Sequence, residues 1–490
     1  MRSVDPIKLE KPPANANTKK QNPRRTIPIA PAGEPELYAK RENIYPRAVH
    51  GVFARWRVFF VALTLGIYYG LPWVNWGEGR QAFLIDLPGR KFNLFFWTFW
   101  PQDLFYLTAI LIISALSLFL FTAIAGRLWC GYTCPQTVWT EVFLWIERRI
   151  EGDRLHQMRL AASRWTGEKL LKKGAKHLVW ILFSAWTGFT FVGYFTPIRE
   201  LAVSVTQFAL GPWEMFWILF YGFATYGNAG FLREQVCIYM CPYARFQSVM
   251  FDRDTLVISY DSARGEPRGA RARSDDYKAK GLGDCIDCTL CVQVCPTGID
   301  IRNGLQYQCI SCGACVDVCD TVMDKMGYPK GLIRHTTQNE LERGERRRIL
   351  RPRVLVYGSI LGGVALALLV AVLLRVPLEL DVIRDRNSLY RETPDGLIEN
   401  VYTLKILNMD IRPHRYRLSA EGIDDLKLVL ERAPIAAGAG EVTEVPVRLQ
   451  APAEELEHRS SHVRFTLQAE DDPALRVSEE ARFLGPASHR

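Results

Sequence analysis

The sequence predicts a multi-domain membrane protein with an α-helical membrane domain of about five spans, a small α+β domain rich in cysteine, and a C-terminal all-β sandwich of the immunoglobulin-like kind. Three observations predict these parts. Apolar runs long enough to cross a bilayer recur along the 490 residues. Two short runs contain eight of the 12 cysteines. Beyond residue 376, segments such as Val401–Leu407 and Val463–Leu467 alternate apolar and polar residues, as strands of a sandwich do.

The N-terminal half is organised around the apolar runs. Residues 1–57 are polar and rich in Pro, Lys and Arg, which predicts a mobile cytosolic tail. The membrane domain is expected over residues 58–253, and residues 77–103 within it are expected to form a loop with an aromatic, interfacial half-helix. The five candidate spans are Val58–Trp73, Leu104–Ala125, Leu178–Phe195, Trp213–Phe231 and Val354–Leu374.

Basic residues predict how these spans are oriented. The formal net charge is +9, and the positive charges cluster beside apolar runs, at residues 148–176 and 343–353. Positively charged loops stay in the cytosol, so both segments are expected there. Five crossings then place residues 376–490 on the opposite side. This clustering is typical of membrane orientation, and we expect no nucleic-acid partner.

Both cysteine-rich runs read C-x2-C-x2-C-x3-C, the spacing with which bacterial ferredoxins bind [4Fe–4S] clusters. The alternatives are disulfides and structural zinc, but zinc usually takes C-x2-C pairs rather than triplets. The ferredoxin domain with its basic juxtamembrane segment is expected over residues 285–353, after a polar linker at 254–284. In two-cluster ferredoxins the fourth cysteine of each run ligates the other cluster. Cluster one is therefore expected on Cys285, Cys288, Cys291 and Cys319, and cluster two on Cys309, Cys312, Cys315 and Cys295.

The other four cysteines form two C-x3-C-P motifs, Cys130/Cys134 and Cys237/Cys241, each just after a candidate span and an arginine. On a helix, residues i and i+4 lie on one face, so each pair is expected to present two sulfurs to one ion. Thiolates are soft ligands that select Cu(I), zinc or iron–sulfur clusters. The alternative is that these cysteines are small buried hydrophobic residues. Whether the two pairs form one site or two stays open.

Several motifs together resemble a known family. They are D-L-P-G-R-K-F at Asp86–Phe92, the two C-x3-C-P motifs, S-Y-D-S-A-R-G-E-P-R-G at Ser259–Gly269, the double ferredoxin run and the terminal sandwich. In this combination the chain is similar to the FixG/RdxA/CcoG accessory proteins of cbb-type cytochrome c oxidase, over nearly all of its length except the N-terminal tail. The membrane part also resembles quinol-dehydrogenase polyferredoxins, which as a rule lack the sandwich.

The resemblance implies a role in assembling the oxidase, by reduction of Cu(II) to Cu(I) for its copper centre. Cys130, Cys134, Cys237 and Cys241 would then bind copper as the catalytic, metal-binding residues, and two [4Fe–4S] clusters would be the cofactors. The implied location is the bacterial inner membrane, with the ferredoxin domain cytoplasmic and residues 376–490 periplasmic. The expected partners are a copper chaperone or transporter, oxidase subunits or assembly factors, and an electron donor that the sequence does not identify.

Two other functions remain open at this stage. One is a quinol-linked electron-transfer subunit, and the other is a non-enzymatic iron–sulfur scaffold or redox sensor. The sequence contains neither a P-loop nor a dinucleotide fingerprint after a strand, so a nucleotide cofactor would belong to a separate protein. Asp86 and Arg90 fit either a site or a turn. Glu141 and Glu147 are expected to be interfacial charges rather than acid–base groups.

Overall fold

The computed structural model describes residues 43–486, apart from residues 77–78, 96, 387, 411 and 457 and the side chain of residue 248. Most of the expected N-terminal tail, residues 1–42, therefore lies outside the described residues. Helix α1 (Val52–Gly70) already begins within the last part of that tail. The Asp317 carboxylate accepts hydrogen bonds from the backbone nitrogens of Phe53 and Ala54, at 3.1 and 2.7 Å. A distant residue thus caps this helix, which the local sequence could not reveal.

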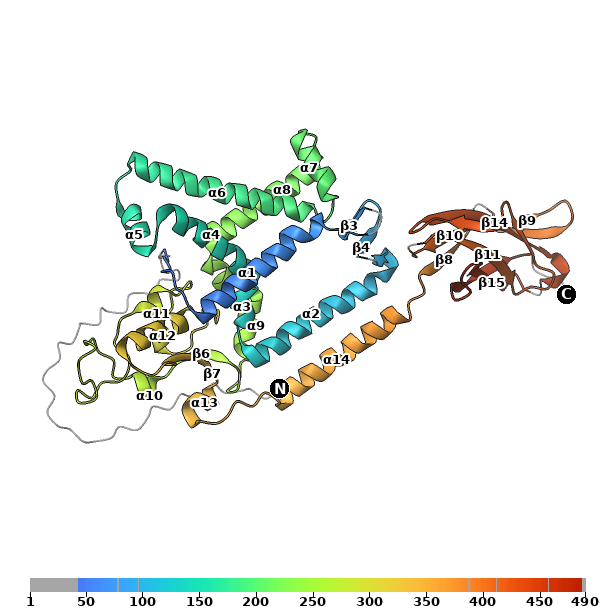
Figure 1. Ribbon diagram of the computed structural model, residues 1–490. Helices are drawn as coiled ribbons and strands as arrows, with labels where there is room; N and C mark the ends of the chain where they lie inside the picture. The colour runs from blue at the N-terminus through green and yellow to red at the C-terminus, as the bar shows by residue number, and fades with distance from the viewer. Residues whose placement is uncertain are drawn as a thin grey trace, which may run out of the picture. The chain divides into compact units, whose positions relative to one another are not determined.

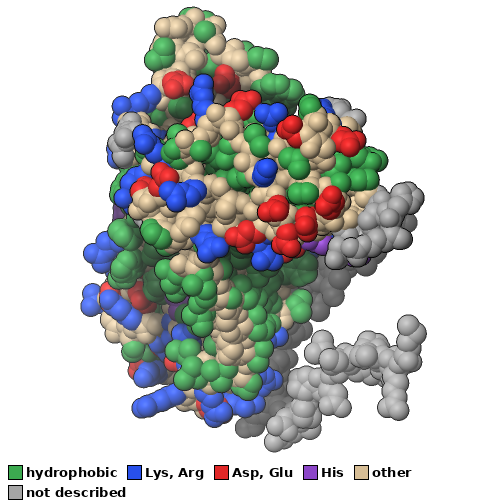
Figure 2. All heavy atoms as spheres, turned by 90° about the vertical axis from the view of Figure 1, so that its right-hand side faces the viewer, with side chains coloured by type: hydrophobic (Ala, Val, Ile, Leu, Met, Phe, Trp, Pro, Cys, Tyr) green, Lys and Arg blue, Asp and Glu red, His purple; other side chains and the backbone are tan. Residues whose placement is uncertain are grey.

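Within the described residues, 3 helices are long and apolar enough to cross a membrane. They are α1 with the turn η1 (Leu71–Trp73), α2 (Leu104–Ala125) with the turn η2 (Pro101–Asp103), and α14 (Pro352–Leu373). Figure 2 shows hydrophobic side chains gathered on one face, with Lys and Arg side chains below them. The protein therefore has membrane character, with fewer qualifying helices than the five predicted spans.

Helices α6 (Gly167–Val192) and α8 (Pro212–Thr225) form most of the third and fourth predicted spans, and neither meets the same criterion. Four lysines occupy the first turns of α6, so its apolar part is short. Helix α8 has 14 residues before the chain continues as the π-helical segment η3 (Tyr226–Leu232). The prediction of five spans rested on apolar runs alone, whereas α6 begins with a basic stretch and α8 gives way to a π-helical segment.

Four of the long helices pack as two pairs, α2 with α14 and α6 with α8 (Figure 1). Helices α2 and α14 lie along each other, and the Tyr106 hydroxyl donates to the Ala371 carbonyl at 3.2 Å. Helices α6 and α8 approach through glycines: a Cβ at Gly188 would lie 2.2 Å from the Ile218 carbonyl oxygen. Small residues at such a crossing bring two backbones close together, as in membrane helix pairs.

The segment between α1 and α2 forms strands instead of the predicted half-helix. Strands β3 (Phe83–Asp86), β4 (Lys91–Leu94) and β5 (Trp97–Phe99) make an antiparallel sheet, and β1 (Asn75–Trp76) pairs with β2 (Arg80–Gln81). The D-L-P-G-R-K motif is the turn between β3 and β4, where Gly89 donates its backbone N–H to Asp86 at 2.9 Å. Aromatic residues in this segment favour strands as well as membrane interfaces, which explains the wrong assignment.

The ferredoxin domain contains α11 (Leu290–Gln293), η5 (Ile301–Asn303), α12 (Ala314–Met326) and α13 (Gln338–Arg343). Strand β6 (Val257–Tyr260) pairs antiparallel with β7 (Ile333–Thr336), and α10 (Ser262–Gly265) follows β6. The expected linker at 254–284 therefore contributes one strand and one short helix to this domain. The pairing joins segments on either side of both cysteine runs, so no local pattern revealed it.

The C-terminal region is an antiparallel sandwich. One sheet has the order β12-β14-β10-β8 with β9 beside β10, and the other has the order β13-β11-β15-β16. The buried rings of Tyr402 and Phe465 meet across the two sheets at 5.2 Å. Both alternating runs named above lie in strands, β10 and β15, as predicted. The strands are β8 (Leu378–Arg384), β9 (Arg391–Glu392), β10 (Leu397–Asn408), β11 (His414–Glu421), β12 (Lys427–Leu430), β13 (Ile435–Ala437), β14 (Val442–Pro452), β15 (Ser460–Ala469) and β16 (Arg476–Leu484).

A buried histidine lies between two carboxylates in the sandwich. His414 lies between Asp471 at 2.7 Å and Asp410 at 2.8 Å. Burial lowers the pKa of His414, but the hydrogen bonds to the two carboxylates outweigh burial and raise that pKa above its ordinary value. The stability contribution is therefore complete below about pH 6.5, the ordinary histidine value, and is lost as the pH rises through the raised pKa.

We expect the amides of β11 to become less protected against hydrogen exchange between pH 6 and pH 9, after correction for intrinsic rates, because the two ion pairs disappear. The His414→Gln variant should lose this pH dependence. Exchange mass spectrometry of the full-length protein measures both effects. Equal pH dependence in the variant and the wild type would show that another group is responsible.

Candidate functional site

The first ferredoxin cavity is surrounded by four cysteines from both runs. Cys285, Cys288, Cys291 and Cys319 line it. Between the first three cysteines, Asp287 (φ 53°) and Thr289 (φ 58°) adopt left-handed conformations, which turn the backbone tightly around the cavity. These four residues are the set expected for cluster one.

The second cavity has the complementary set. Cys295, Cys309, Cys312 and Cys315 line it together with the shared Cys291. Ser311 and Gly313 supply the left-handed turns here. Each apolar cavity is lined by at least four cysteines drawn from both runs, which fits a [4Fe–4S] cubane with one thiolate per iron. The individual ligand assignments remain predictions.

Several of the cysteines around these cavities are poorly solvated, whereas Cys288 is exposed. Burial raises the pKa of Cys319, and likewise that of Cys309, to about 12. Without metal these groups are neutral thiols at neutral pH, so cluster binding must release their protons.

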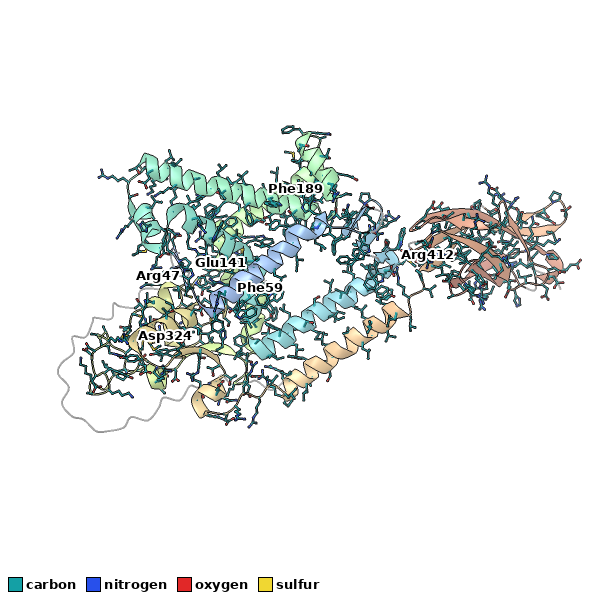
Figure 3. The ribbon with its side chains drawn as sticks, in the orientation of Figure 1. Arg47, Phe59, Glu141, Phe189, Asp324 and Arg412 are labelled. Atoms are coloured by element: carbon teal, nitrogen blue, oxygen red, sulfur yellow. The ribbon has the colours of Figure 1, made fainter. Side chains whose placement is uncertain are left out.

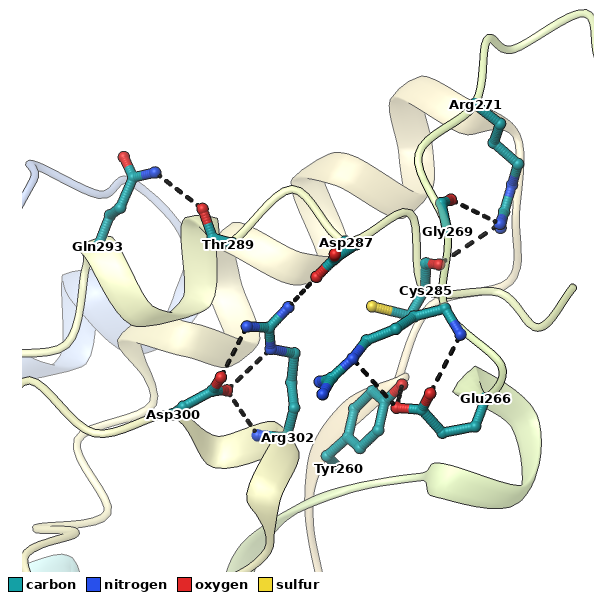
Figure 4. Close-up of polar contacts among 11 residues, drawn as sticks. Tyr260, Glu266, Gly269, Arg271, Cys285, Asp287, Thr289, Gln293, Asp300 and Arg302 are labelled. Atoms are coloured by element: carbon teal, nitrogen blue, oxygen red, sulfur yellow. Dashed lines mark hydrogen bonds and ion pairs between the residues drawn. The ribbon is translucent and has the colours of Figure 1, made fainter. Parts of the chain in front are cut away.

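Arginine side chains hold the loop around the first cavity (Figure 4). Arg302 contacts Asp300 at 2.6 Å and Asp287 at 2.5 Å, and it therefore ties the turn between two cysteines to the residues that follow the first run. Arg271 donates to the Gly283 carbonyl at 2.7 Å and to the Cys285 carbonyl at 3.4 Å. These bonds hold the loop that carries the cysteines of the first run.

The two C-x3-C-P motifs do not lie on continuous helices, contrary to the prediction. Cys130 belongs to α3 (Leu128–Tyr132), and Cys134 precedes α4 (Pro135–Glu151) with ψ 129°. Cys237 lies in the π-helical turn η4 (Val236–Met240), and Cys241 precedes α9 (Pro242–Met250) with ψ 109°. Each motif's proline disfavours the helical conformation at the cysteine before it, and this breaks the i, i+4 geometry.

The four thiols of these motifs nevertheless share one neighbourhood. Burial raises the pKa of Cys237 to about 12, and Cys134, Cys130 and Cys241 each add to that rise. Burial also raises the pKa of Cys130 to about 11, with further contributions from Cys134 and Cys241. The described residues contain no group of three or more His, Cys, Asp or Glu side chains arranged to hold a single ion. The thiols are therefore gathered without forming a closed single-ion site.

Gln247 of α9 connects the second motif to the first. The Cys130 thiol donates to the Gln247 side-chain oxygen at 3.5 Å. Gln247 is fully buried, and its side-chain nitrogen has no hydrogen-bond partner within the described part of the chain. This amide can accept from a neutral thiol or, once turned, donate to a thiolate.

The first motif also touches the loop that carries cluster-two ligands. A Cβ at Gly131 would lie 2.6 Å from the Ile310 carbonyl oxygen and 2.9 Å from the Cys312 Cα, so only glycine permits this approach. The neighbouring Tyr132 hydroxyl donates to the Cys312 carbonyl at 3.3 Å. The residue that follows Cys130 therefore contacts the backbone of Ile310 and Cys312, which line the second cavity.

Arg127 lies where the first motif meets the loop that carries cluster-two ligands. Its guanidinium is buried and donates to the backbone carbonyls of Tyr307 and Ala244, and to that of Cys309 at 3.5 Å. Burial raises the pKa of the Cys130 and Cys237 thiols, and the charge of Arg127 opposes that rise. The end of α2, helix α9 and the loop before cluster two thus converge on one cation.

Several of these residues were not recognised from the sequence as functional. Gln247 and Gly131 gave no signal, because their roles depend on contacts with distant segments. An arginine before each C-x3-C-P motif was visible, but the two differ: Arg233 binds Glu147 at 2.9 Å instead of reaching the ferredoxin domain. Glu141 likewise forms ion pairs, with Arg57 and Arg148. Both glutamates were expected to be interfacial charges, but Glu147 is buried among its ion-pair partners.

Comparisons with known proteins support this picture. A family described as a 4Fe-4S dicluster domain matches residues 232–338, and a 4Fe-4S binding domain matches residues 107–152. A family described as an IG-like fold at the C-terminus of FixG matches residues 368–486. Protein RdxB of Cereibacter sphaeroides is 42% identical over 411 residues, covering 81% of this chain and 86% of that protein. The chain belongs to the FixG/RdxA family.

Other members of the FixG/RdxA family also match this chain. Protein RdxA of Cereibacter sphaeroides is 43% identical, with 82% of this chain and 88% of that protein covered. The nitrogen fixation protein FixG of Rhizobium meliloti is 38% identical, with 79% and 80% covered. The crystal structure of a FixG-related protein from Vibrio parahaemolyticus is 30% identical over 22% of this chain and 95% of that one, with a TM-score of 0.20. The resemblance inferred from the motifs is confirmed, and the chain is an iron–sulfur electron-transfer protein of this family.

Proposed function

We propose that this protein reduces Cu(II) to Cu(I) at Cys130, Cys134, Cys237 and Cys241. Clusters held by the eight ferredoxin cysteines supply the single electron that each ion requires. The observation that carries the proposal is the contact of Gly131 with Ile310 and Cys312, because it places a thiol of the first motif beside the wall of the second cavity.

The thiols favour the product of this reaction. Soft sulfur ligands bind Cu(I) in preference to Cu(II), so binding and reduction support each other. The pKa of Cys130 is about 11 and that of Cys237 about 12, mainly because both are buried. They therefore bind as thiolates only by losing protons as the metal enters. As Cys130 changes from thiol to thiolate, the Gln247 amide first accepts a hydrogen bond from the thiol and then, once turned, donates one to the thiolate.

The two cavities differ in their surroundings, which suggests the order in which an electron passes through their clusters. The first is lined only by residues of the ferredoxin domain, and its Cys288 is exposed. The second adjoins Gly131, Tyr132 and Arg127. We infer that the electron donor approaches at the first cavity and that copper is served from the second.

We further propose that α6 and α8 with η3 also cross the membrane, which gives five crossings. Both helices expose apolar side chains, among them Leu182 at 61% and Phe223 at 77%, which water would not favour. With the basic segments in the cytosol, the ferredoxin domain lies on the cytoplasmic side of the bacterial inner membrane and the sandwich in the periplasm.

The biological role that fits is maturation of the copper centre of a cbb-type cytochrome c oxidase. This role follows from the family resemblance, since a reduced, thiol-bound copper ion suits transfer to another protein. The partners would be a copper chaperone or transporter and the oxidase subunits or assembly factors.

The proposal is tested with a variant in which all four C-x3-C-P cysteines are serine. We expect it to keep the brown [4Fe–4S] absorbance while losing Cu(I) binding and chelator-detected Cu(II) reduction. The retained absorbance is the internal control for folding. Unchanged copper reduction by this variant would exclude these cysteines as the site.

Removing the amide of Gln247 should weaken copper binding without affecting the clusters. A hydrogen bond to a charged group contributes about 1.5–3 kcal/mol, so Gln247→Leu is expected to lower Cu(I) affinity by roughly 10- to 100-fold. Competition with a Cu(I) chelator measures the affinity. Gln235→Leu, a change two residues before Cys237, is the matched control. Equal affinities for both variants and the wild type would show that Gln247 only fills space.

A further inference from the structure

A cleft lined by arginines lies at the beginning of α1. It contains about 710 Å³ and is bounded by residues 46–51, the first turns of α1, helix α4, and Val294 and Pro296 of the ferredoxin domain. Figure 3 labels Arg47 and Glu141 at this end of α1. The charged residues of its described lining are Arg47, Arg55, Arg57, Arg148 and Glu141.

The positive charge of this cleft exceeds its negative charge. The single carboxylate of the described lining, Glu141, is shared by Arg148 at 3.1 Å and Arg57 at 3.5 Å. Arg47 and Arg55 are exposed and have no carboxylate partner among the residues that the structure describes. A concave surface with an excess of one charge concentrates ions of the opposite charge, so the cleft attracts an anion.

The cleft also has apolar walls at the level where a membrane would begin. Arg55 lies in the first turn of a helix able to span the bilayer. Val58 and Trp145, which line the cleft, are 65% and 53% exposed, and Arg149 stacks over the Trp145 ring at 5.4 Å. Arginine and tryptophan at the end of a spanning helix are typical of the membrane interface. The ligand should therefore combine an anionic head with an apolar body.

We propose that this cleft binds an anionic phospholipid, whose phosphate contacts Arg47, Arg55 and Arg148 and whose acyl chains lie on Val58 and Trp145. Basic pockets beside spanning helices on the cytoplasmic side bind such headgroups. The chain's own residues 1–42 are a poor occupant, because they contain nine Lys and Arg against five Asp and Glu. An acidic soluble protein would leave the apolar wall uncovered.

The test uses the full-length protein in nanodiscs and the double variant Arg47→Gln/Arg55→Gln, which changes two exposed side chains. The matched control is Arg346→Gln/Arg348→Gln, two exposed arginines of the other basic segment. Native mass spectrometry counts retained cardiolipin, and hydrogen exchange reports protection of residues 44–58. We expect about 30-fold weaker cardiolipin binding in the cleft variant, the equivalent of about 2 kcal/mol, and no change in the control.

Several outcomes would overturn the proposal. Equal binding by the cleft variant and the wild type would do so, as would equal protection by zwitterionic lipid. Protection by pyrophosphate alone in detergent would identify a soluble phosphate ligand, and protection by an acidic protein but not by lipid would identify a protein partner. None of these measurements uses copper, so a result against lipid binding would leave the proposed reductase activity unaffected.

Discussion

Replacing Gly131 with alanine is expected to lower the rate of Cu(II) reduction by about 100-fold while both clusters remain bound. The added Cβ would lie 2.6 Å from the Ile310 carbonyl oxygen, a backbone atom that cannot move aside cheaply. The first motif would have to withdraw from the second cavity, and a displacement of about 1 Å between reacting groups can cost this much. Stopped-flow detection of Cu(I) with a chelator measures the rate.

The control for this variant is Gly227→Ala, because a Cβ at Gly227 meets no atom within 4 Å. We expect it to behave like the wild type. If Gly131→Ala reduced copper at the wild-type rate with its clusters intact, the close approach of the two segments would have no role in electron transfer.

Replacing Arg127 with methionine is expected to lower the reduction potential of one cluster and not that of the other. A cation and hydrogen bonds near a cluster stabilise its reduced, more negative form. Arg127 reaches the Cys309 carbonyl, whereas Arg302 serves the first cavity. One kcal/mol corresponds to about 40 mV for one electron, so we expect a fall of a few tens of millivolts.

Redox titration followed by electron paramagnetic resonance measures both potentials. Arg302→Gln is the matched variant, and it should shift the potential of the cluster that Arg127→Met leaves unchanged. If both variants moved the same signal, or if neither moved any, the assignment of Arg127 to the second cavity would be wrong. A parallel drop in thermal stability is expected for Arg127→Met, because three backbone carbonyls lose their donor.

The sequence predicted those parts of the molecule whose chemistry is local. The C-x2-C-x2-C-x3-C spacing brings ligands together through tight turns, and the structure places the eight cysteines around two cavities, with Cys291 lining both. The assignment of each cysteine to one cluster stays a prediction. The alternation of apolar and polar residues was enough to predict the sandwich, because each strand has one buried face. Three of the five candidate spans are helices long and apolar enough to cross a membrane.

The remaining features depend on contacts between distant segments. The pairing of β6 with β7 joins the two ends of the ferredoxin domain. Gly131 and Gln247 acquire their roles only when the two C-x3-C-P motifs and the cluster-two loop meet. The broken helices at Cys134 and Cys241 could have been anticipated, because a proline follows each cysteine.

The most direct test of the account is a single-turnover reaction of the reduced protein with Cu(II) under anaerobic conditions. Rapid-freeze electron paramagnetic resonance follows the reduced clusters and Cu(II), and X-ray absorption reports the copper ligands. The account predicts that one Cu(II) disappears for each electron lost by the clusters and that the resulting Cu(I) has sulfur ligands. Clusters that stay reduced while Cu(II) persists, or Cu(I) bound without sulfur, would contradict it.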